Sequence, residues 1–232
     1  MAAAEPTVGI VAGEASGDLL GAHLIRAVKE RLPQVRFEGI GGPRMQAAGL
    51  DALFPMETLA VMGYGEVLRR YPELAGIRRG LARRFLAQRP ALFVGVDAPD
   101  FNLGLEEKLR GAGIPTAHFV SPSIWAWRGG RINKIKRAVS RMLALFPFEQ
   151  AIYEQAGVPV TYVGHPLAEM LATVPTRTAM REQLRVPAAA KIVALLPGSS
   201  ATIFAAAGTR SCSRIAVRVG TVASISARGC PT

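Results

Sequence analysis

The acidic side chains that follow one apolar run are the first candidates for chemistry. Asp97 comes directly after the strand-like run 91–96, and Asp100 and Asn102 follow closely. A partly desolvated carboxylate at the end of a buried strand gains basicity and could take the proton of an attacking hydroxyl group. We therefore predict that Asp97 is a general base. The alternative is that one of these three polar side chains only caps the following helix.

A glycine-bearing turn separates the first apolar run from the first helix-like segment. The turn reads Gly13-Glu-Ala-Ser-Gly-Asp18. Ligands of open α/β sheets bind at the carboxyl ends of strands, where a helix N-terminus offers free N–H groups to anions. The spacing is not Gly-x-Gly-x-x-Gly, so the dinucleotide fingerprint is absent. The turn is either a ligand loop or merely a tight turn, and we expect Ser16 to cap the helix.

Both tryptophans of the chain, Trp125 and Trp127, lie in one short stretch that follows another apolar run. Five basic residues follow them: Arg128, Arg131, Lys134, Lys136 and Arg137. Aromatic groups beside cations can stack on a sugar or a base, or bind an anionic lipid. The alternative is a pair of core aromatics under a solvated basic helix. This stretch alone does not exclude an RNA-binding protein.

Three further segments are candidates for binding. The apolar stretch 59–64 contains Met62 and precedes Arg69 and Arg70, so it is either a membrane-facing surface that receives acyl chains or a buried loop. His165 follows an apolar run and is a possible ligand contact, although a lone histidine is more often structural. Ser199 ends a Pro-Gly-Ser turn that suits a phosphate or an interdomain hinge.

Short apolar runs alternate with helix-like segments from residue 7 to residue 198, which is typical of an α/β fold with a Rossmann-like parallel sheet and crossover helices. The expected strands are Thr7–Ala12, Val35–Ile40, Ala91–Val96, Thr116–Val120, Met142–Phe146, Val160–Val163 and Ile192–Leu196. The expected helices are Asp18–Arg31, Tyr71–Gln88, Leu103–Gly111, Gly130–Val139, Phe148–Ala156 and Arg177–Leu184. Most of these strands are apolar on both faces, as buried parallel strands require.

Composition narrows the class of protein. The 232 residues are 50% hydrophobic but contain no uninterrupted apolar run of about 18 residues, the length that spans a bilayer. The N-terminus lacks the basic region of a secretory signal, so we expect a cytoplasmic protein. Its two cysteines suggest neither a disulfide framework nor a zinc site. The net charge of +11 indicates an anionic partner: nucleic acid, lipid headgroups or a phosphorylated substrate.

From Ser200 onward the sequence changes character, becoming rich in Ser and Thr and free of acidic residues. It has no clean hydrophobic period. We interpret it either as an ordinary C-terminal extension or as the product of a frameshift in the gene.

Several of these strings, taken in order, resemble the lipid-A-disaccharide synthase family over roughly residues 7–199. They are Gly13-Glu-Ala-Ser-Gly-Asp18, Gly41-Gly-Pro-Arg-Met45, Ala60-Val-Met-Gly63, Val96-Asp-Ala-Pro-Asp-Phe-Asn102, Val120-Ser-Pro-Ser-Ile-Trp-Ala-Trp127, Pro147-Phe-Glu149, Gly164-His165 and Leu195-Leu-Pro-Gly-Ser199.

The resemblance implies the first domain of a two-domain glycosyltransferase B-type fold. The implied reaction is inverting transfer of 2,3-diacylglucosamine from its UDP conjugate to the 6-hydroxyl of 2,3-diacylglucosamine 1-phosphate, with no metal and no cofactor. Asp97 matches the general base proposed for the family. We expect substrate contacts from Glu14, Ser16, Gly17, Asp18, Met62, Asp100, Asn102, Trp127, His165 and Ser199. Both substrates are anionic and acylated, so the surplus charge suits the inner face of the cytoplasmic membrane and needs no nucleic acid.

The resemblance ends at Ser200, where the family continues Pro-Gly-Ser-Arg into a second, donor-binding domain. We expect an acceptor-binding domain over residues 1–190, the start of the donor domain over 191–199, and an atypical tail, frameshifted or disordered, over 200–232. The chain alone is then expected to be inactive. Two alternatives stay open: a related glycosyltransferase with another lipid acceptor, and a non-catalytic module that binds anionic lipid or RNA. The sequence does not indicate an oligomeric state.

Overall fold

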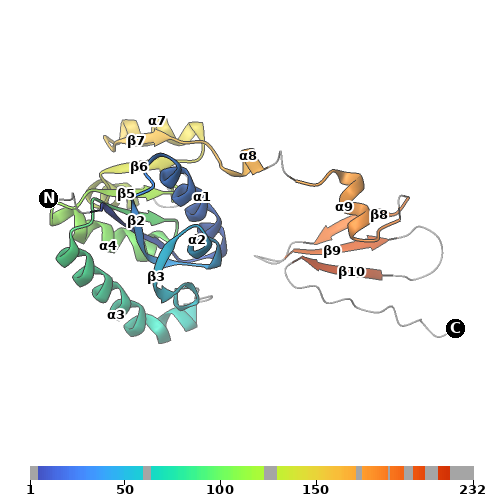
Figure 1. Ribbon diagram of the computed structural model, residues 1–232, viewed down its shortest axis with the longest axis horizontal. Coiled ribbons are helices and arrows are strands. Elements are labelled where there is room, and N and C mark those ends of the chain that lie inside the picture. The colour runs from blue at the N-terminus through green and yellow to red at the C-terminus, as the bar shows by residue number, and fades with distance from the viewer. Residues whose placement is uncertain are drawn as a thin grey trace. The chain divides into compact units, whose positions relative to one another are not determined.

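A computed structural model describes residues 5–59, 64–122, 130–170, 174–187, 189–195, 201–206 and 214–219 (Figure 1). The chain divides into two compact units, Met1–Leu167 and Ala168–Thr232. In the described part, no helix combines the length and the apolar character needed to cross a bilayer.

The first unit is built on a seven-stranded sheet in the order β3-β2-β1-β4-β5-β6-β7, and all neighbouring strands are parallel. The strands are β1 (Thr7–Ala12), β2 (Arg36–Gly41), β3 (Leu50–Pro55), β4 (Leu92–Val96), β5 (Thr116–Phe119), β6 (Arg141–Ala144) and β7 (Val160–Tyr162). The predicted α/β class with a Rossmann-like parallel sheet is confirmed. The strand order reverses between β1 and β4, and such a reversal opens a crevice at the carboxyl ends of the two strands.

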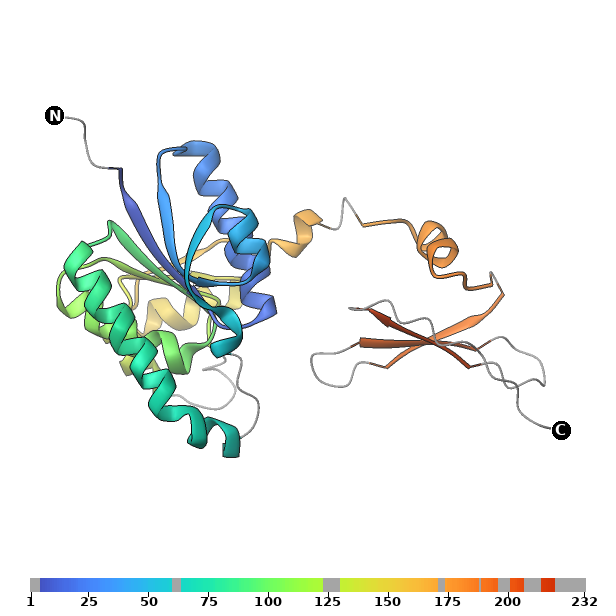
Figure 2. The same cartoon turned by 60° about the horizontal axis from the view of Figure 1, so that its bottom comes forward.

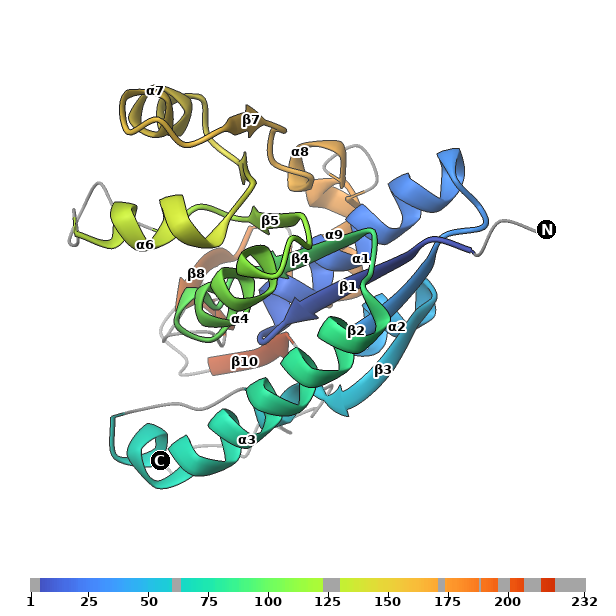
Figure 3. The ribbon, with the colours of Figure 1, turned by 90° about the vertical axis from the view of Figure 1, so that its left-hand side faces the viewer.

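Helices cover both faces of this sheet. They are α1 (Ala15–Arg31), α2 (Pro43–Ala47), α3 (Tyr64–Gln88), α4 (Pro99–Gly111), α6 (Arg131–Ala138) and α7 (Pro147–Gln155), with a 3₁₀ turn η1 (Met56–Thr58). Ile10 of β1 packs with α1 and α2, whereas the next residue, Val11, packs with α3 and α4 on the other face. Figure 3 shows these helices around the strands of the sheet. Successive strand residues point to opposite faces, so a strand covered on both must be continuously apolar.

Every strand expected from the sequence is present within two residues of its predicted bounds, and every expected helix is present, although α1, α3 and α4 begin earlier. The edge strand β3, the helix α2 and the turn η1 were not predicted. The prediction that Ser16 caps α1 is wrong: the N-cap residue is Glu14, and exposed Ser16 lies inside the first turn.

The second unit contains a three-stranded antiparallel sheet in the order β10-β9-β8 (Figure 2). Its strands are β8 (Lys191–Leu195), β9 (Ala201–Ala206) and β10 (Arg214–Val219); α8 (Leu167–Met170) and α9 (Arg177–Gln183) precede them in sequence. The strand predicted near residue 192 is present as β8, and it pairs antiparallel with β9. The proposed boundaries at residues 190 and 199 stay a prediction.

Candidate functional site

A pocket of about 360 Å³ lies where the strand order reverses. Three of its acidic residues were predicted as site residues: Glu14 after β1, and Asp97 and Asp100 after β4. The other lining residues are Leu59, Tyr71, Leu74, Ala75, Arg78, Ala98, Pro99 and Phe101. The pocket therefore combines an apolar wall from α3 with carboxylates carried by the strand ends.

The turn that carries Asp97 has an unusual backbone. Asp97 and Ala98 are both left-handed, with φ of 51° and 42°. This conformation is unfavourable for residues other than glycine, and such strain is typical of functional sites. The N-cap of α4 is Ala98 and no side chain caps the helix, so the alternative that Asp97, Asp100 or Asn102 serves only as a cap is wrong.

Asn102 of α4 holds this turn from below. Its Nδ2 group donates to the carbonyl of Asp97 at 2.8 Å and faces the carbonyls of Val96 at 3.4 Å and Val11 at 3.3 Å. The side chain is fully buried and does not line the pocket. The amide of Asn102 therefore fixes the ends of β1 and β4, and its contact with substrate stays a prediction.

One helical turn after Asn102, Glu106 forms a buried polar pair with His118 that the sequence analysis did not predict. Glu106 Oε1 is 2.7 Å from His118 Nδ1, and both side chains are fully buried. Gly95 of β4 makes room for them, because a Cβ there would lie 2.1 Å from Glu106 Oε1 and 2.8 Å from the Cβ of Asn102. The close approach of α4 to β4 therefore depends on a glycine. The i, i+4 spacing of Asn102 and Glu106 is the sequence signal that both share one helix face.

The glycine turn after β1 contributes less to the pocket than predicted. A Cβ added to Gly17 would lie 3.3 Å from the Cβ of Ala12, so this glycine lies close to the end of β1. Neither Gly17 nor Ser16 is among the described residues that line the pocket. Asp18 is buried, and its carboxylate accepts hydrogen bonds from the backbone N–H groups of Arg44 at 3.1 Å and Met45 at 2.9 Å. These are first-turn donors of α2, so Asp18 caps that helix from a distance. The substrate contact expected of Asp18 stays a prediction.

The carboxyl end of β5 is the second strained position at this edge of the sheet. Val120 has a φ of 78°, although it is β-branched, and its N–H donates to the carbonyl of Leu143 at 3.2 Å. The next residue, Ser121, is hydrogen-bonded through Oγ to the hydroxyl of buried Tyr153 at 2.8 Å. Burial raises the pKa of Tyr153 to about 12. Three further predicted site residues, Met62, Trp127 and Ser199, lie outside the described residues.

The remaining predicted residues lie apart from one another. Asp100 forms an ion pair with Arg131 of α6 at 2.6 Å. His165 does not line the pocket; its Nδ1 accepts from the backbone N–H of Leu167 at 3.2 Å, and its ring centroid lies 6.2 Å from that of Phe146. Among the described residues, no group of three or more His, Cys, Asp or Glu side chains is arranged to hold a metal ion.

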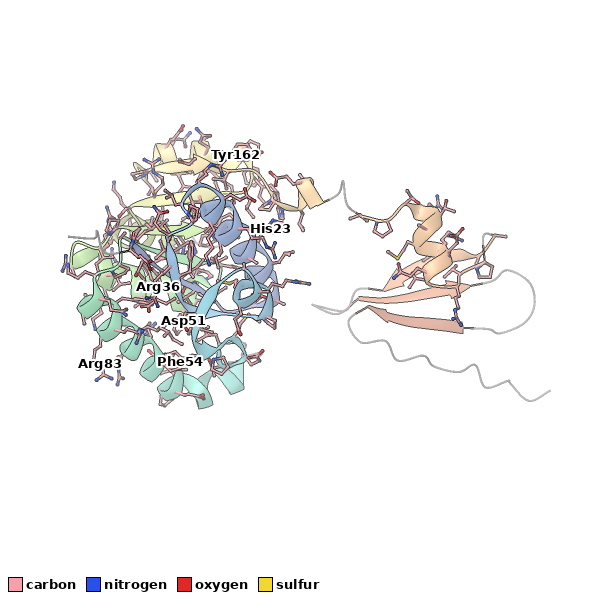
Figure 4. All side chains as sticks on the ribbon, in the orientation of Figure 1. His23, Arg36, Asp51, Phe54, Arg83 and Tyr162 are labelled. Atoms are coloured by element: carbon pink, nitrogen blue, oxygen red, sulfur yellow. The ribbon has the colours of Figure 1, made fainter. Side chains whose placement is uncertain are left out.

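A smaller pocket of about 130 Å³ is lined by Arg36, Glu38, Asp51 and Arg84 among others. Figure 4 labels Arg36 and Asp51 on β2 and β3. The Arg84 guanidinium donates to the Glu38 carboxylate at 3.0 Å, and this hydrogen bond raises the pKa of Arg84. The two cations and two carboxylates leave this pocket without surplus charge, so the pocket beside Asp97 is the better candidate site.

Comparisons with known proteins match most of the chain. A family model described as lipid-A-disaccharide synthetase matches residues 8–205. The lipid-A-disaccharide synthase of Aromatoleum aromaticum is 64% identical over 192 residues, covering 83% of this chain and 49% of the relative. That of Methylobacillus flagellatus is 62% identical over 194 residues, covering 84% and 51%. The chain thus spans about half the length of these relatives.

Among solved structures, Phytolacca americana UGT2 complexed with UDP-2fluoro-glucose and pterostilbene aligns with a TM-score of 0.50 at 12% sequence identity. The alignment covers 81% of this chain and 58% of that one. At this identity the likeness concerns the fold alone. It confirms the prediction of one domain of a glycosyltransferase B-type architecture.

Proposed function

The chain belongs to the lipid-A-disaccharide synthetase family, and from that premise we propose that its first unit is the acceptor-binding half of an inverting glycosyltransferase. The proposed reaction transfers 2,3-diacylglucosamine from UDP-2,3-diacylglucosamine to the 6-hydroxyl of 2,3-diacylglucosamine 1-phosphate. The observation that carries this proposal is the carboxylate of Asp97, which a strained turn presents to the pocket where the strand order reverses.

In the proposed mechanism Asp97 acts on the acceptor. As the acceptor hydroxyl oxygen bonds to the anomeric carbon of the donor, its proton passes to the Asp97 carboxylate. The bond between that carbon and the diphosphate breaks, and UDP leaves from the opposite face, which inverts the configuration. Asn102 assists by donating to the Asp97 carbonyl at 2.8 Å, which fixes the backbone that carries the carboxylate before the substrate binds.

The apolar wall supports an acylated acceptor. Leu59, Tyr71 and Leu74 line the same pocket as Asp97, and the side chain of Tyr71 is exposed. An exposed apolar wall beside a charged site is typical of proteins that take lipid from a bilayer surface. Together with the net charge of +11, this supports peripheral association with the anionic inner face of the cytoplasmic membrane.

The proposal is tested by joining residues 1–195 to the remaining half of the Aromatoleum aromaticum relative and measuring disaccharide formation. We expect Asp97→Asn to lower kcat about 100- to 10,000-fold, as loss of a general base does, with acceptor binding retained. The matched control is Asp51→Asn, which changes an exposed carboxylate of β3 outside the pocket and should leave turnover unchanged. We expect the chain without the added half to form no disaccharide.

Turnover by the Asp97→Asn fusion within a few-fold of the parent fusion would contradict the proposed role of Asp97. A fusion that binds anionic lipid or RNA but never forms disaccharide would favour the non-catalytic module. Transfer to a different lipid acceptor, with Asp97 still required, would favour a related glycosyltransferase.

A further inference from the structure

Negative charges outnumber positive charges among the described side chains that line the pocket. Its carboxylates belong to Glu14, Asp97 and Asp100, whereas Arg78 of α3 is the basic residue among the described lining residues. Asp100 already pairs with Arg131 of α6 at 2.6 Å. Within the described part of the chain, the Arg78 guanidinium makes neither an ion pair nor a hydrogen bond. A half-buried cation therefore faces the pocket with its donors unused.

A glycine on the neighbouring helix leaves space for the guanidinium of Arg78. A Cβ added to Gly104 of α4 would lie 3.1 Å from Arg78 Nη1 and 3.6 Å from its Cζ. The guanidinium thus lies against the backbone of α4, where even a methyl group would crowd it. Glycine inside a helix destabilises the helix relative to alanine. At position 104 this loss of helix stability is accompanied by space for the guanidinium of Arg78.

We propose that Arg78 binds a phosphoryl group of the sugar-phosphate substrate in this pocket. A guanidinium presents two parallel N–H donors that match two phosphate oxygens. The carboxylates of Glu14 and Asp97 repel a phosphate, and the guanidinium of Arg78 offsets part of this repulsion. The identity of the ligand as a sugar phosphate rests on the proposed function. The phosphoryl group belongs either to the acceptor or to the donor, and the test separates these sources.

The test measures binding to the full 232-residue chain by calorimetry, with glucosamine 1-phosphate, glucosamine and UDP as probes. We expect the parent chain to bind glucosamine 1-phosphate more tightly than glucosamine. Arg78→Ala should lower the affinity for the phosphate probe about 10- to 100-fold, which is the usual effect of losing hydrogen bonds to a charged group. The affinity for glucosamine should not change. Arg83→Ala is the matched control, because Figure 4 shows Arg83 on the same helix pointing away from the unit.

A second variant separates binding from folding. Gly104→Ala should push the guanidinium aside and weaken the phosphate probe, yet the melting temperature should stay equal or rise because alanine favours the helix. A response confined to UDP would assign Arg78 to the donor phosphate, and a response to glucosamine 1-phosphate would assign it to the acceptor. Equal affinities for Arg78→Ala and Arg83→Ala, or no binding of either phosphate probe to the parent chain, would overturn the inference.

The failure of this inference is distinguishable from failure of the proposed function. A chain that binds glucosamine 1-phosphate through Arg78, but whose fusion never transfers sugar, would overturn the glycosyltransferase and leave the phosphate site standing. A fusion that requires Asp97 for transfer, but whose phosphate affinity is unchanged by Arg78→Ala, would overturn the phosphate site and leave the glycosyltransferase standing.

Discussion

The buried hydroxyl of Tyr153 makes the stability of the first unit depend on alkaline pH. Tyr153 is fully buried in α7, and desolvation raises its pKa to about 12 from the usual value of about 10. Below about pH 10 the folded and unfolded states both keep the phenolic proton, and the stabilisation is fully present. Between about pH 10 and 12 the unfolded state loses the proton first, so the free energy of unfolding falls as the pH rises.

The magnitude follows from the size of the pKa shift. One pKa unit corresponds to about 1.4 kcal/mol, so a shift of about two units removes about 3 kcal/mol across this range. Tyr153→Phe abolishes the titration but also loses the hydrogen bond to Ser121, which contributes about 1 kcal/mol. The variant should therefore be less stable than the parent at about pH 9 and more stable by about 2 kcal/mol near pH 12.

Urea unfolding followed by circular dichroism, repeated from about pH 8 to 12, tests this crossing. Comparing parent with variant cancels the titration of every other group. Tyr162→Phe serves as the control, because the side chain of Tyr162 is exposed on β7. Removing its hydroxyl group should leave the pH profile of the parent unchanged. If the curves of parent and Tyr153→Phe stay parallel up to about pH 12, the reasoning about burial of this hydroxyl is refuted.

Three further changes probe the turn that carries Asp97. Asn102→Asp places a buried carboxylate against backbone carbonyls and should cost about 3 to 5 kcal/mol by urea unfolding; a loss below about 1 kcal/mol would contradict the hydrogen bonds assigned to Asn102. Ala98→Gly relieves a left-handed residue and should be neutral or stabilising by about 1 kcal/mol, whereas Ala27→Gly on the exposed face of α1 should cost about 1 kcal/mol; equal losses in chemical denaturation would argue against the strain. Gly95→Ala should cost about 1 to 3 kcal/mol in thermal melts, because its methyl group meets Glu106, and an unchanged melting temperature would show that α4 can move away.

The sequence predicts the central sheet and the position of Asp97 well, for a physical reason. Strands buried on both faces must be continuously apolar, and Asp97 stands at the abrupt end of such a run. The edge strand β3 escapes this pattern because Asp51 and Ala52 are exposed. The run that became β8 is as apolar as the others, and its pattern does not reveal that its partner is antiparallel.

Tertiary packing decides the parts of the site that the sequence does not reveal. Arg78 and Gly104 belong to different helices, and only the packing of α3 against α4 brings them together. Asn102 could have been a cap, a ligand contact or a core residue, since a polar residue near a helix start is compatible with all three. Ser16 was predicted to cap α1 from its residue type, but the helix begins earlier and its buried Asp18 serves α2 instead.

The backbone strain of the first unit is concentrated where the proposed chemistry occurs. Asp97, Ala98 and Val120 are left-handed at the carboxyl ends of the neighbouring strands β4 and β5. The other left-handed residues that are not glycine, among those described, are Arg89 and Arg185, which follow helices, where this conformation is ordinary.

Strain persists only where surrounding contacts determine the backbone, and each of these turns has such a contact within the unit. The amide of Asn102 holds the carbonyl of Asp97, and the hydroxyl of Tyr153 holds Ser121 beside Val120. None of these contacts requires a residue beyond 167, so the first unit forms the described lining of the pocket by itself. We therefore expect this unit to bind a sugar phosphate by itself, and the second half to be needed for transfer rather than for building the acceptor pocket.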